Sequence, residues 1–208
     1  MAALIEEHGE LEIEPADDLF ERLIVSILRQ QVSMASAAAT RDRLFDAVEI
    51  TPSGVLEADE STLVDAGLSR QKRRYVRNVA EAFLEHGYDK ADFAELSDAA
   101  VVDELTTITG IGEWTAEMQL LFTFGRPDVF PVGDLGIRKG MWNLFDEELT
   151  REEMREIATR WKPYRSYASL YLWRVQEEIS ESVAEVIKND AETATPTRSP
   201  HSSSDSDS

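Results

Sequence analysis

The chain has 208 residues, of which 41 are Asp or Glu and 21 are Lys or Arg, giving a formal net charge of −20. This length is enough for one or two domains with a hydrophobic core, and no run of about 18 apolar residues would span a membrane. The absence of cysteine excludes disulfides, thiolate zinc sites and iron–sulfur clusters. The N-terminus lacks the features of a signal peptide, so we expect a cytoplasmic protein.

Acidic residues are spread over most of the chain and do not gather in one tail. Residues 1–21 hold eight acids and no Lys or Arg, and only five of the basic residues are lysines. Two interpretations stay open, namely a solvated surface suited to very high salt and a surface that binds basic proteins. Acidic, Lys-poor surfaces of the first kind resemble those of haloarchaeal proteins.

Apolar residues recur at helical spacing almost throughout the chain, which predicts an all-α fold. Leu11 and Ile13 alternate with acids, but no partner strand is apparent. The Thr-, Pro-, Ser- and Asp-rich segment 189–208 is too polar to form a core, so we expect it to be disordered. The predicted helices span 19–28, 34–48, a segment starting at Pro52, 61–66, 70–87, 97–105, 113–122, 135–145, 151–161 and 166–187.

The stretch Gly110-Ile111-Gly112 separates two of these helices. Glycine allows the backbone to turn tightly, and the helix that follows presents its first N–H groups outward with a partial positive charge. Such a turn binds a phosphate without a basic side chain, which suits a chain as acidic as this one. The alternative is a tight connection between two helices that serves only packing.

Residues 105–116 resemble the helix–hairpin–helix motif of DNA-repair proteins. The loop 128–134, Asp-Val-Phe-Pro-Val-Gly-Asp, follows the hairpin as it does in the helix–hairpin–helix DNA glycosylase superfamily. Segments 27–33, 66–72 and 161–168 are similar to the 3-methyladenine DNA glycosylase II branch, and the resemblance covers about residues 16–176. It implies two helical subdomains with the active-site cleft between them. We assign residues 1–32 and 135–188 to one subdomain and 33–134, with the hairpin at 105–124, to the other.

Asp134 precedes a predicted helix, where its plainest role is that of an N-cap. The helix end would keep its carboxylate ionised. The resemblance implies that Asp134 is the catalytic aspartate. Cleavage of an N-glycosidic bond builds positive charge on the sugar, and a fixed carboxylate stabilises that charge.

Trp114 occupies the position where lyase members of the superfamily carry a Schiff-base lysine. Without that amine no imine forms, so we expect a monofunctional glycosylase. The indole either packs in the core or lines a pocket for a cationic base. By resemblance, Trp161 and Tyr164 approach the flipped base, and Phe20 is assigned to the same pocket.

Gln30 and Gln31 follow an apolar helix, either as an exposed helix end or as DNA contacts. The resemblance implies that Gln31 fills the gap left by a flipped nucleotide. Positions 70–77 hold five basic residues, of which Arg70 and Lys72 are predicted to contact phosphates; a solvated face of paired charges is the alternative. The remaining predicted DNA contacts lie in the hairpin, at Gly110, Ile111, Gly112 and Thr115.

The resemblance also implies that hairpin carbonyls hold a Na⁺ or K⁺ ion, and we assign these to Thr106, Ile108 and Ile111. No other cofactor is expected. The predicted function is excision of alkylated purines from damaged double-stranded DNA by a monomer. Two alternatives stay open, a helix–hairpin–helix protein that binds DNA without catalysis and an acidic scaffold for basic partners.

Overall fold

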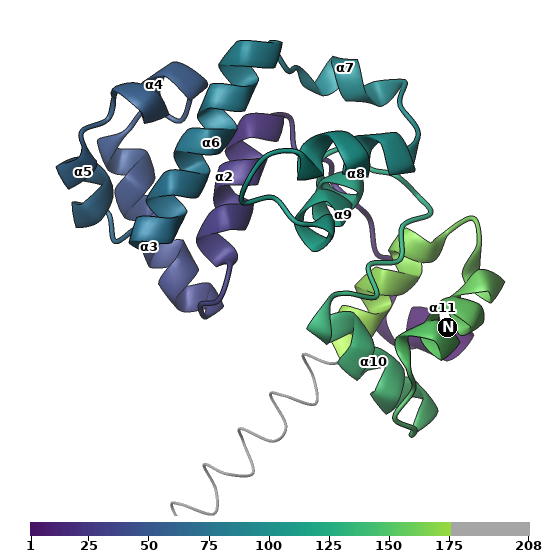
Figure 1. The fold of residues 1–208 in the computed structure, drawn as a ribbon. Helices are drawn as coiled ribbons and strands as arrows, with labels where there is room; N and C mark the ends of the chain where they lie inside the picture. Colours follow the sequence, from purple (N-terminus) through teal and green to yellow (C-terminus); the bar gives the residue numbers. More distant parts are fainter. Residues whose placement is uncertain (176–208) are drawn as a thin grey trace, which may run out of the picture.

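The computed structural model describes residues 1–175, except for the side chain of Met34, and their regular structure is entirely helical (Figure 1). The prediction of an all-α fold is thus confirmed, and residues 11–14 form no strand. The helices are α1 (Ala2–His8), α2 (Leu19–Arg29), α3 (Met34–Ala47), α4 (Pro52–Glu57), α5 (Glu60–Asp65), α6 (Arg70–His86), α7 (Lys90–Ala94), α8 (Asp98–Thr106), α9 (Glu113–Phe122), α10 (Leu135–Phe145), α11 (Arg151–Ala158), a 3₁₀ turn η1 (Thr159–Trp161) and a final helix described from 165 to 175.

Side-chain caps set several of the predicted helix starts. Ser33, Thr51, Ser69 and Ser97 each accept a hydrogen bond from a backbone N–H in the first turn of α3, α4, α6 and α8. Helices α1 and α7 were not predicted. Each is short and buries a single side chain, so neither has an apolar stripe that periodicity could detect.

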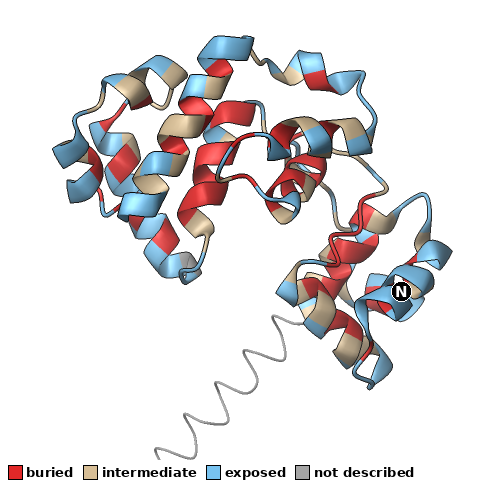
Figure 2. Ribbon diagram, viewed as in Figure 1, coloured by how far each residue is buried: buried red, intermediate tan, exposed pale blue. Residues whose placement is uncertain are grey.

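The larger hydrophobic core is built around α2, whose apolar face packs against α3, α6 and α9. Eight of the eleven residues of α2 are buried, including Leu23, Ile24 and Ile27. Figure 2 shows this helix as the most continuously buried segment of the upper part of the molecule. The assignment of residues 1–32 to the other subdomain is therefore wrong for 19–29, because α2 fills the centre of the larger one.

The smaller core lies between α10, α11 and the final helix, which Figure 1 shows grouped apart from α2 to α9. It includes Ile137, Met141, Met154 and Leu172, and Met1 at the start of α1 packs against it. Trp173 is the exception, since it packs against both cores. This residue therefore lies where the two subdomains meet.

Two segments without helix connect the subdomains, residues 9–18 and residues 123–134, and both are held by hydrogen bonds. In the first, Tyr171 Oη donates to the carbonyl of Gly9, and the N–H of Ala16 donates to the carbonyl of Phe122. In the second, the hydroxyl of buried Ser166 donates to the carbonyl of Arg126 and accepts from the N–H of Val129. Residues 126–129, which lead to Asp134, are thus fixed to the final helix.

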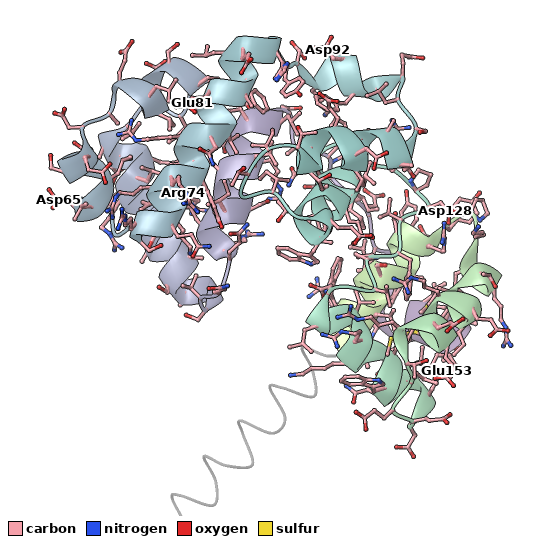
Figure 3. All side chains as sticks on the ribbon, in the orientation of Figure 1. Asp65, Arg74, Glu81, Asp92, Asp128 and Glu153 are labelled. Carbon is pink, nitrogen blue, oxygen red and sulfur yellow. The ribbon has the colours of Figure 1, made fainter. Side chains whose placement is uncertain are left out.

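Acidic side chains cover the outside of both subdomains. Figure 3 shows Asp65, Asp92 and Glu153 at the periphery, on three different helices. No helix among residues 1–175 is long and apolar enough to cross a bilayer. The predicted disordered segment 189–208 and the predicted helical residues 176–188 lie outside the described residues.

Candidate active site

Asp134 is the N-cap of α10 and accepts three hydrogen bonds. The backbone N–H of Ile137 and the indole N–H of Trp173 donate to Oδ1, at 2.9 and 2.8 Å, and the indole N–H of Trp114 donates to Oδ2 at 2.9 Å. The donors come from three different helices, so both carboxylate oxygens are fixed in direction. The capping and the functional interpretations of Asp134 are compatible, because the cap is one of the contacts that orient the carboxylate.

Gly136 makes the contact between Trp173 and Asp134 possible. A Cβ atom at this position would lie 2.7 Å from Cδ1 of Trp173 and 3.0 Å from Oδ1 of Asp134. Any other residue would push the indole away from the carboxylate. On its other side, the Trp173 ring stacks on Phe122 of α9, with ring centroids 5.7 Å apart.

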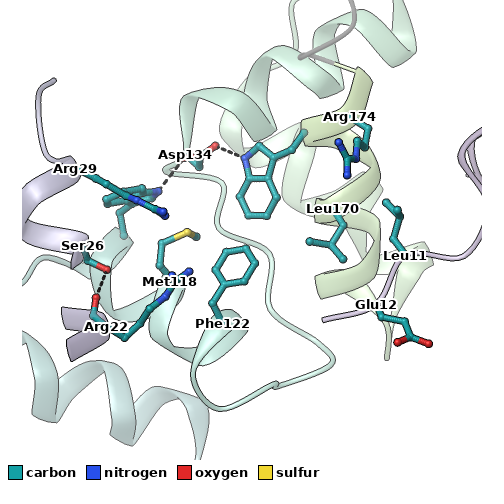
Figure 4. Close-up of a pocket in the computed structure, with 12 residues that line it drawn as sticks. Leu11, Glu12, Arg22, Ser26, Arg29, Met118, Phe122, Asp134, Leu170 and Arg174 are labelled. Atoms are coloured by element: carbon teal, nitrogen blue, oxygen red, sulfur yellow. Dashed lines mark hydrogen bonds between the residues drawn. The ribbon is translucent and has the colours of Figure 1, made fainter. Parts of the chain in front are cut away.

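A pocket of about 570 Å³ opens beside Asp134, at the junction of the subdomains. Figure 4 shows Asp134 at its edge, with side chains of α2 and α9 on one side and of the final helix on the other. Its volume fits a molecule the size of a nucleobase. The lining residues are Leu11, Glu12, Arg22, Ser26, Arg29, Trp114, Met118, Phe122, Asp134, Leu170, Trp173 and Arg174.

Glu117 is a second carboxyl group close to this site, three residues after Trp114 on α9. Burial, and next the charge of Glu113, raise the pKa of Glu117 to about 7; the charge of Asp134 adds to the rise, and that of Arg155 opposes it. Among residues 1–175 no donor binds its carboxyl oxygens. The two neighbouring carboxyl groups thus differ in their surroundings: Asp134 accepts three hydrogen bonds, whereas Glu117 has no donor in the described residues and a pKa raised to about 7.

The hairpin between α8 and α9 packs tightly against α6. Gly110 has φ of +117°, and a Cβ atom there would lie 2.5 Å from the ring of Tyr75. Asn78 Nδ2 donates to the carbonyl of Thr109, and Gln30 Nε2 donates to the carbonyl of Gly110. The turn is therefore held in place by side chains from two other helices.

The hairpin residues differ in what they present to solvent. Gly112 is exposed and begins α9 without a side-chain cap, so the first N–H groups of α9 face outward. Ile111 is buried and contributes only its backbone. Thr115 is 2% exposed, so its predicted contact with DNA is wrong for the side chain. Of the three predicted cation ligands, the carbonyl of Ile108 accepts the N–H of Ile111.

The two glutamines have separate positions. Gln30 turns toward the hairpin, whereas Gln31 is exposed at the tip of the turn with φ of 57°. This left-handed conformation is unusual for a residue other than glycine and marks a constrained turn. Gln31 lies beside Gly67 and Ser69, next to the start of α6.

The basic segment of α6 is mostly engaged within the protein. Lys72 Nζ donates to the carbonyl of Leu28 at the end of α2, and burial lowers its pKa. Arg73 pairs with Glu60, and Arg77 donates to carbonyls at the end of α4. Arg70 and Arg74 are exposed, and Figure 3 labels Arg74 on α6. The predicted phosphate contact thus fits the position of Arg70 better than that of Lys72.

Of the predicted pocket aromatics, only Trp114 lines the pocket. Phe20 is 4% exposed and packs against Phe83 in the larger core, so its assignment to the pocket is wrong. Trp161 packs against Phe130 in the smaller core, and Tyr164 is 62% exposed beside Tyr167. Neither lines the pocket beside Asp134.

The sequence pattern missed Trp173, Met118, Phe122 and the arginines of α2 as pocket residues. Met118 and Phe122 follow Trp114 at intervals of four, so the helical period puts all three on one face of α9, but it does not show that this face lines a pocket. Trp173 is 39 residues from Asp134, and no local motif joins the two.

Comparison with known proteins identifies the family to which this fold and site belong. Residues 24–163 match the model of the HhH-GPD superfamily base excision DNA repair proteins. DNA-3-methyladenine glycosylase 1 of Schizosaccharomyces pombe is 31% identical over 166 residues, which cover 76% of this chain and 72% of the relative. The chain spans 64% of the length of Bacillus subtilis YfjP and 60% of that of S. pombe mag2, two further relatives.

Solved structures share the fold. S. pombe 3-methyladenine DNA glycosylase Mag1, in complex with abasic DNA, matches with a TM-score of 0.76 and 28% identity, over 83% of this chain and 89% of Mag1. A DNA-3-methyladenine glycosidase from Bacillus halodurans matches with the same TM-score and 33% identity, over 86% of this chain and 85% of that one. The chain therefore belongs to the HhH-GPD superfamily of base excision DNA repair proteins.

Proposed function

We propose that the protein is a monofunctional DNA glycosylase that removes alkylated purines of the 3-methyladenine type from double-stranded DNA. The observation that carries this proposal is the carboxylate of Asp134, held by three N–H donors at the edge of a base-sized pocket. The names of the relatives, DNA-3-methyladenine glycosylases, supply the substrate class.

Asp134 stabilises the positive charge that develops on the sugar as the N-glycosidic bond breaks. A carboxylate that is already oriented does so without reorganising during the reaction. An alkylated purine that is cationic leaves easily, so no strong general acid is required. Trp114 stands in place of a Schiff-base lysine and donates to Asp134, so water is the nucleophile and no covalent imine forms.

The hairpin supplies the DNA anchor under this proposal. The outward N–H groups of α9 bind a phosphate with the help of the helix dipole, and Gln31 fills the space of the flipped nucleotide. Carbonyls of Thr106, Ile108 and Ile111 hold a Na⁺ or K⁺ ion that bridges to the same phosphate. The protein acts as a monomer and needs no other cofactor.

Asp134→Asn tests the catalytic assignment. The variant should bind DNA with an abasic site as the wild type does but release alkyladenine at least about a thousandfold more slowly, because the sugar loses its stabilising charge. Asp103→Asn on α8 makes the same chemical change at an exposed position and should leave release unchanged. Full release by Asp134→Asn would refute the assignment, and a wild type that binds DNA without releasing any base would favour the non-catalytic alternative.

The same binding assay tests the anchor. Contacts made by backbone amides release fewer counterions than contacts made by Lys and Arg, so binding should weaken only slowly as KCl rises. Binding in KCl should also exceed binding in an equal concentration of choline chloride, since choline is too large for a carbonyl site. A steep loss with KCl would show that basic side chains are the main anchor.

A further inference from the structure

Leu135 is an apolar side chain that stays uncovered directly beside the candidate catalytic carboxylate. It is the first residue of α10, next to Asp134 in the chain, and it is 51% exposed. It does not line the pocket, so it lies outside the pocket, next to the edge that Asp134 forms (Figure 4). A single exposed leucine is common on protein surfaces, and it is the place of this one that points to a ligand.

Under the proposed function, the position of Asp134 determines where Leu135 lies on bound DNA. The carboxylate of Asp134 has to face the sugar of the flipped nucleotide to stabilise the charge that develops there. The Cα atom of the next residue is about 3.8 Å away, and the next nucleotide of the strand is about 3.4 Å away along the duplex axis. Leu135 is therefore within reach of the nucleotide that adjoins the flipped one.

The first two turns of α10 also suit the charge of a DNA strand. Leu135 and Lys139 are the exposed residues of these turns, and a spacing of four places them on one face of the helix. Lys139 lies about 6 Å further along the helix axis, and α10 contains no Asp or Glu in a chain that has 41 of them. This face thus offers an apolar group to a sugar or base edge and a cation to a phosphate.

The residue proposed to fill the gap in the duplex leaves work for a second side chain. Gln31 can form hydrogen bonds with the unpaired base of the opposite strand, but its amide is polar. Proteins that separate stacked bases commonly insert apolar side chains such as Leu, Ile or Phe. Gln31 follows α2 in the larger subdomain and Leu135 begins α10 in the smaller one, so the two would contact the DNA from different subdomains.

We propose that Leu135 is a second wedge, which packs against the nucleotide next to the flipped one and keeps it from stacking across the gap, while Lys139 pairs with a phosphate of the same strand. This inference rests on the proposed glycosylase function and adds a positioning residue to the same site. Leu135 acts on the equilibrium between the stacked and the flipped nucleotide and does not touch the reacting atoms. Its effect should therefore depend on how strongly the lesion is paired.

Leu135→Ala is the first test, because alanine keeps α10 helical and removes the apolar surface. We measure kcat/KM for release of 7-methylguanine from two duplexes, one with cytosine opposite the lesion and one with an abasic analogue opposite it. With cytosine, kcat/KM should fall about fivefold to tenfold, the loss expected from burying about half a leucine side chain. With the abasic analogue no base pair has to open, so the fall should be at most about twofold.

Leu84→Ala is the matched control, because Leu84 is 55% exposed near the end of α6 and the chemical change is the same. This variant should keep both kcat/KM values. A second measurement does not depend on catalysis: 2-aminopurine, which fluoresces more when it is unstacked, is placed on either side of an abasic site in two duplexes. Wild type and Leu84→Ala should raise the fluorescence on one side of the site, and Leu135→Ala should raise it less.

Lys139→Gln tests whether the strand lies along α10. Loss of one phosphate contact should weaken binding of abasic-site DNA and lower the slope of log Kd against log KCl concentration by about one. Lys162→Gln, at an exposed position before the final helix, makes the same change and should keep the slope. An unchanged slope in Lys139→Gln would overturn the placement of the strand on α10.

The outcomes distinguish this inference from the proposed function. A wild type that releases no 7-methylguanine from either duplex would refute the glycosylase proposal. For Leu135→Ala, equal falls on both duplexes would show that the side chain only supports the structure around Asp134, and no fall together with unchanged fluorescence would show that it holds no nucleotide. Either result overturns the inference while the glycosylase proposal stands. Thermal unfolding of each variant confirms that it is folded.

Discussion

The two sides of the pocket are built in opposite ways. On the side of α10 and the final helix, the carboxylate of Asp134 is held by donors from three helices, and Gly136 leaves room for one of them. On the side of α2, the guanidinium groups of Arg22 and Arg29 have no acidic partner in the described residues. A closed network fixes a reacting group, whereas unpaired charges remain available to a ligand. Under the proposed function, the carboxylate on the first side stabilises the charge on the sugar, whereas the second side presents positive charge to the ligand.

The largest effect on this contrast should come from a substitution that displaces the Asp134 carboxylate without removing any of its hydrogen-bond donors. Gly136→Ala places a methyl group against Trp173 and Asp134, and kcat should fall about a hundredfold because the carboxylate is displaced. Stability should also fall, because the methyl group displaces a ring that packs against both cores. The kcat is therefore measured at a temperature where thermal unfolding shows that the variant is folded. Gly133→Ala, whose added methyl group meets nothing within 4 Å, is the matched control for both measurements.

Removing a single donor gives a smaller effect. Trp173→Phe keeps an aromatic ring against Phe122 but loses the N–H that binds Oδ1, so kcat should fall about tenfold. Trp142→Phe loses a comparable bond to the carbonyl of Leu149 outside the pocket. That control should keep its kcat, and equal losses in both variants would mean that the bond to Asp134 has no special role.

Glu117 allows a second comparison, because it is a carboxyl group near Asp134 but has no hydrogen-bond donor in the described residues. Its pKa of about 7 in the folded protein exceeds the usual 4.5, so the folded state holds the proton more tightly than the unfolded state. Its contribution to stability is therefore largest below pH 4.5 and is lost as the pH rises to about 7. Relative to wild type, Glu117→Gln should gain about 2–4 °C in Tm between pH 5 and pH 8. Glu148→Gln, at an exposed position outside the helices, is the control; an equal gain there would point to general repulsion among the surface acids.

The sequence was sufficient to predict the all-helical fold, the position of Asp134 and the hairpin, because each depends on local patterns. Trp114 could be assigned to the pocket from its place in the motif, although the sequence left core packing open as the alternative. The contact between Trp114 and Asp134 spans 20 residues and depends on how α9 meets the connection to α10. That geometry is a tertiary property, and no spacing rule gives it.

The errors have a common physical cause. Phe20 belongs to a helix that is buried on several faces, so an apolar stripe alone did not show which of its residues face the pocket. The same helix was assigned to the wrong subdomain, because the order of segments does not say which core a helix fills. Arg22 and Arg29 were missed because a lone arginine on an apolar helix belongs to no motif, and only the packing of α2 places the two side chains at the pocket.

Buried Ser166 has a consequence for how the protein meets its substrate. Its hydroxyl and N–H clamp residues 126–129 to the final helix, and the pair Arg165–Asp128 reinforces the clamp. The other connection, residues 9–18, is held by the hydrogen bonds of Gly9 and Ala16, so both connections between the subdomains are fixed by hydrogen bonds. Under the proposed function the protein keeps its shape on binding, so the DNA duplex must bend and one base pair must open. A lesion that already weakens its base pair lowers the energy of this deformation, so the protein would bind such lesions fastest.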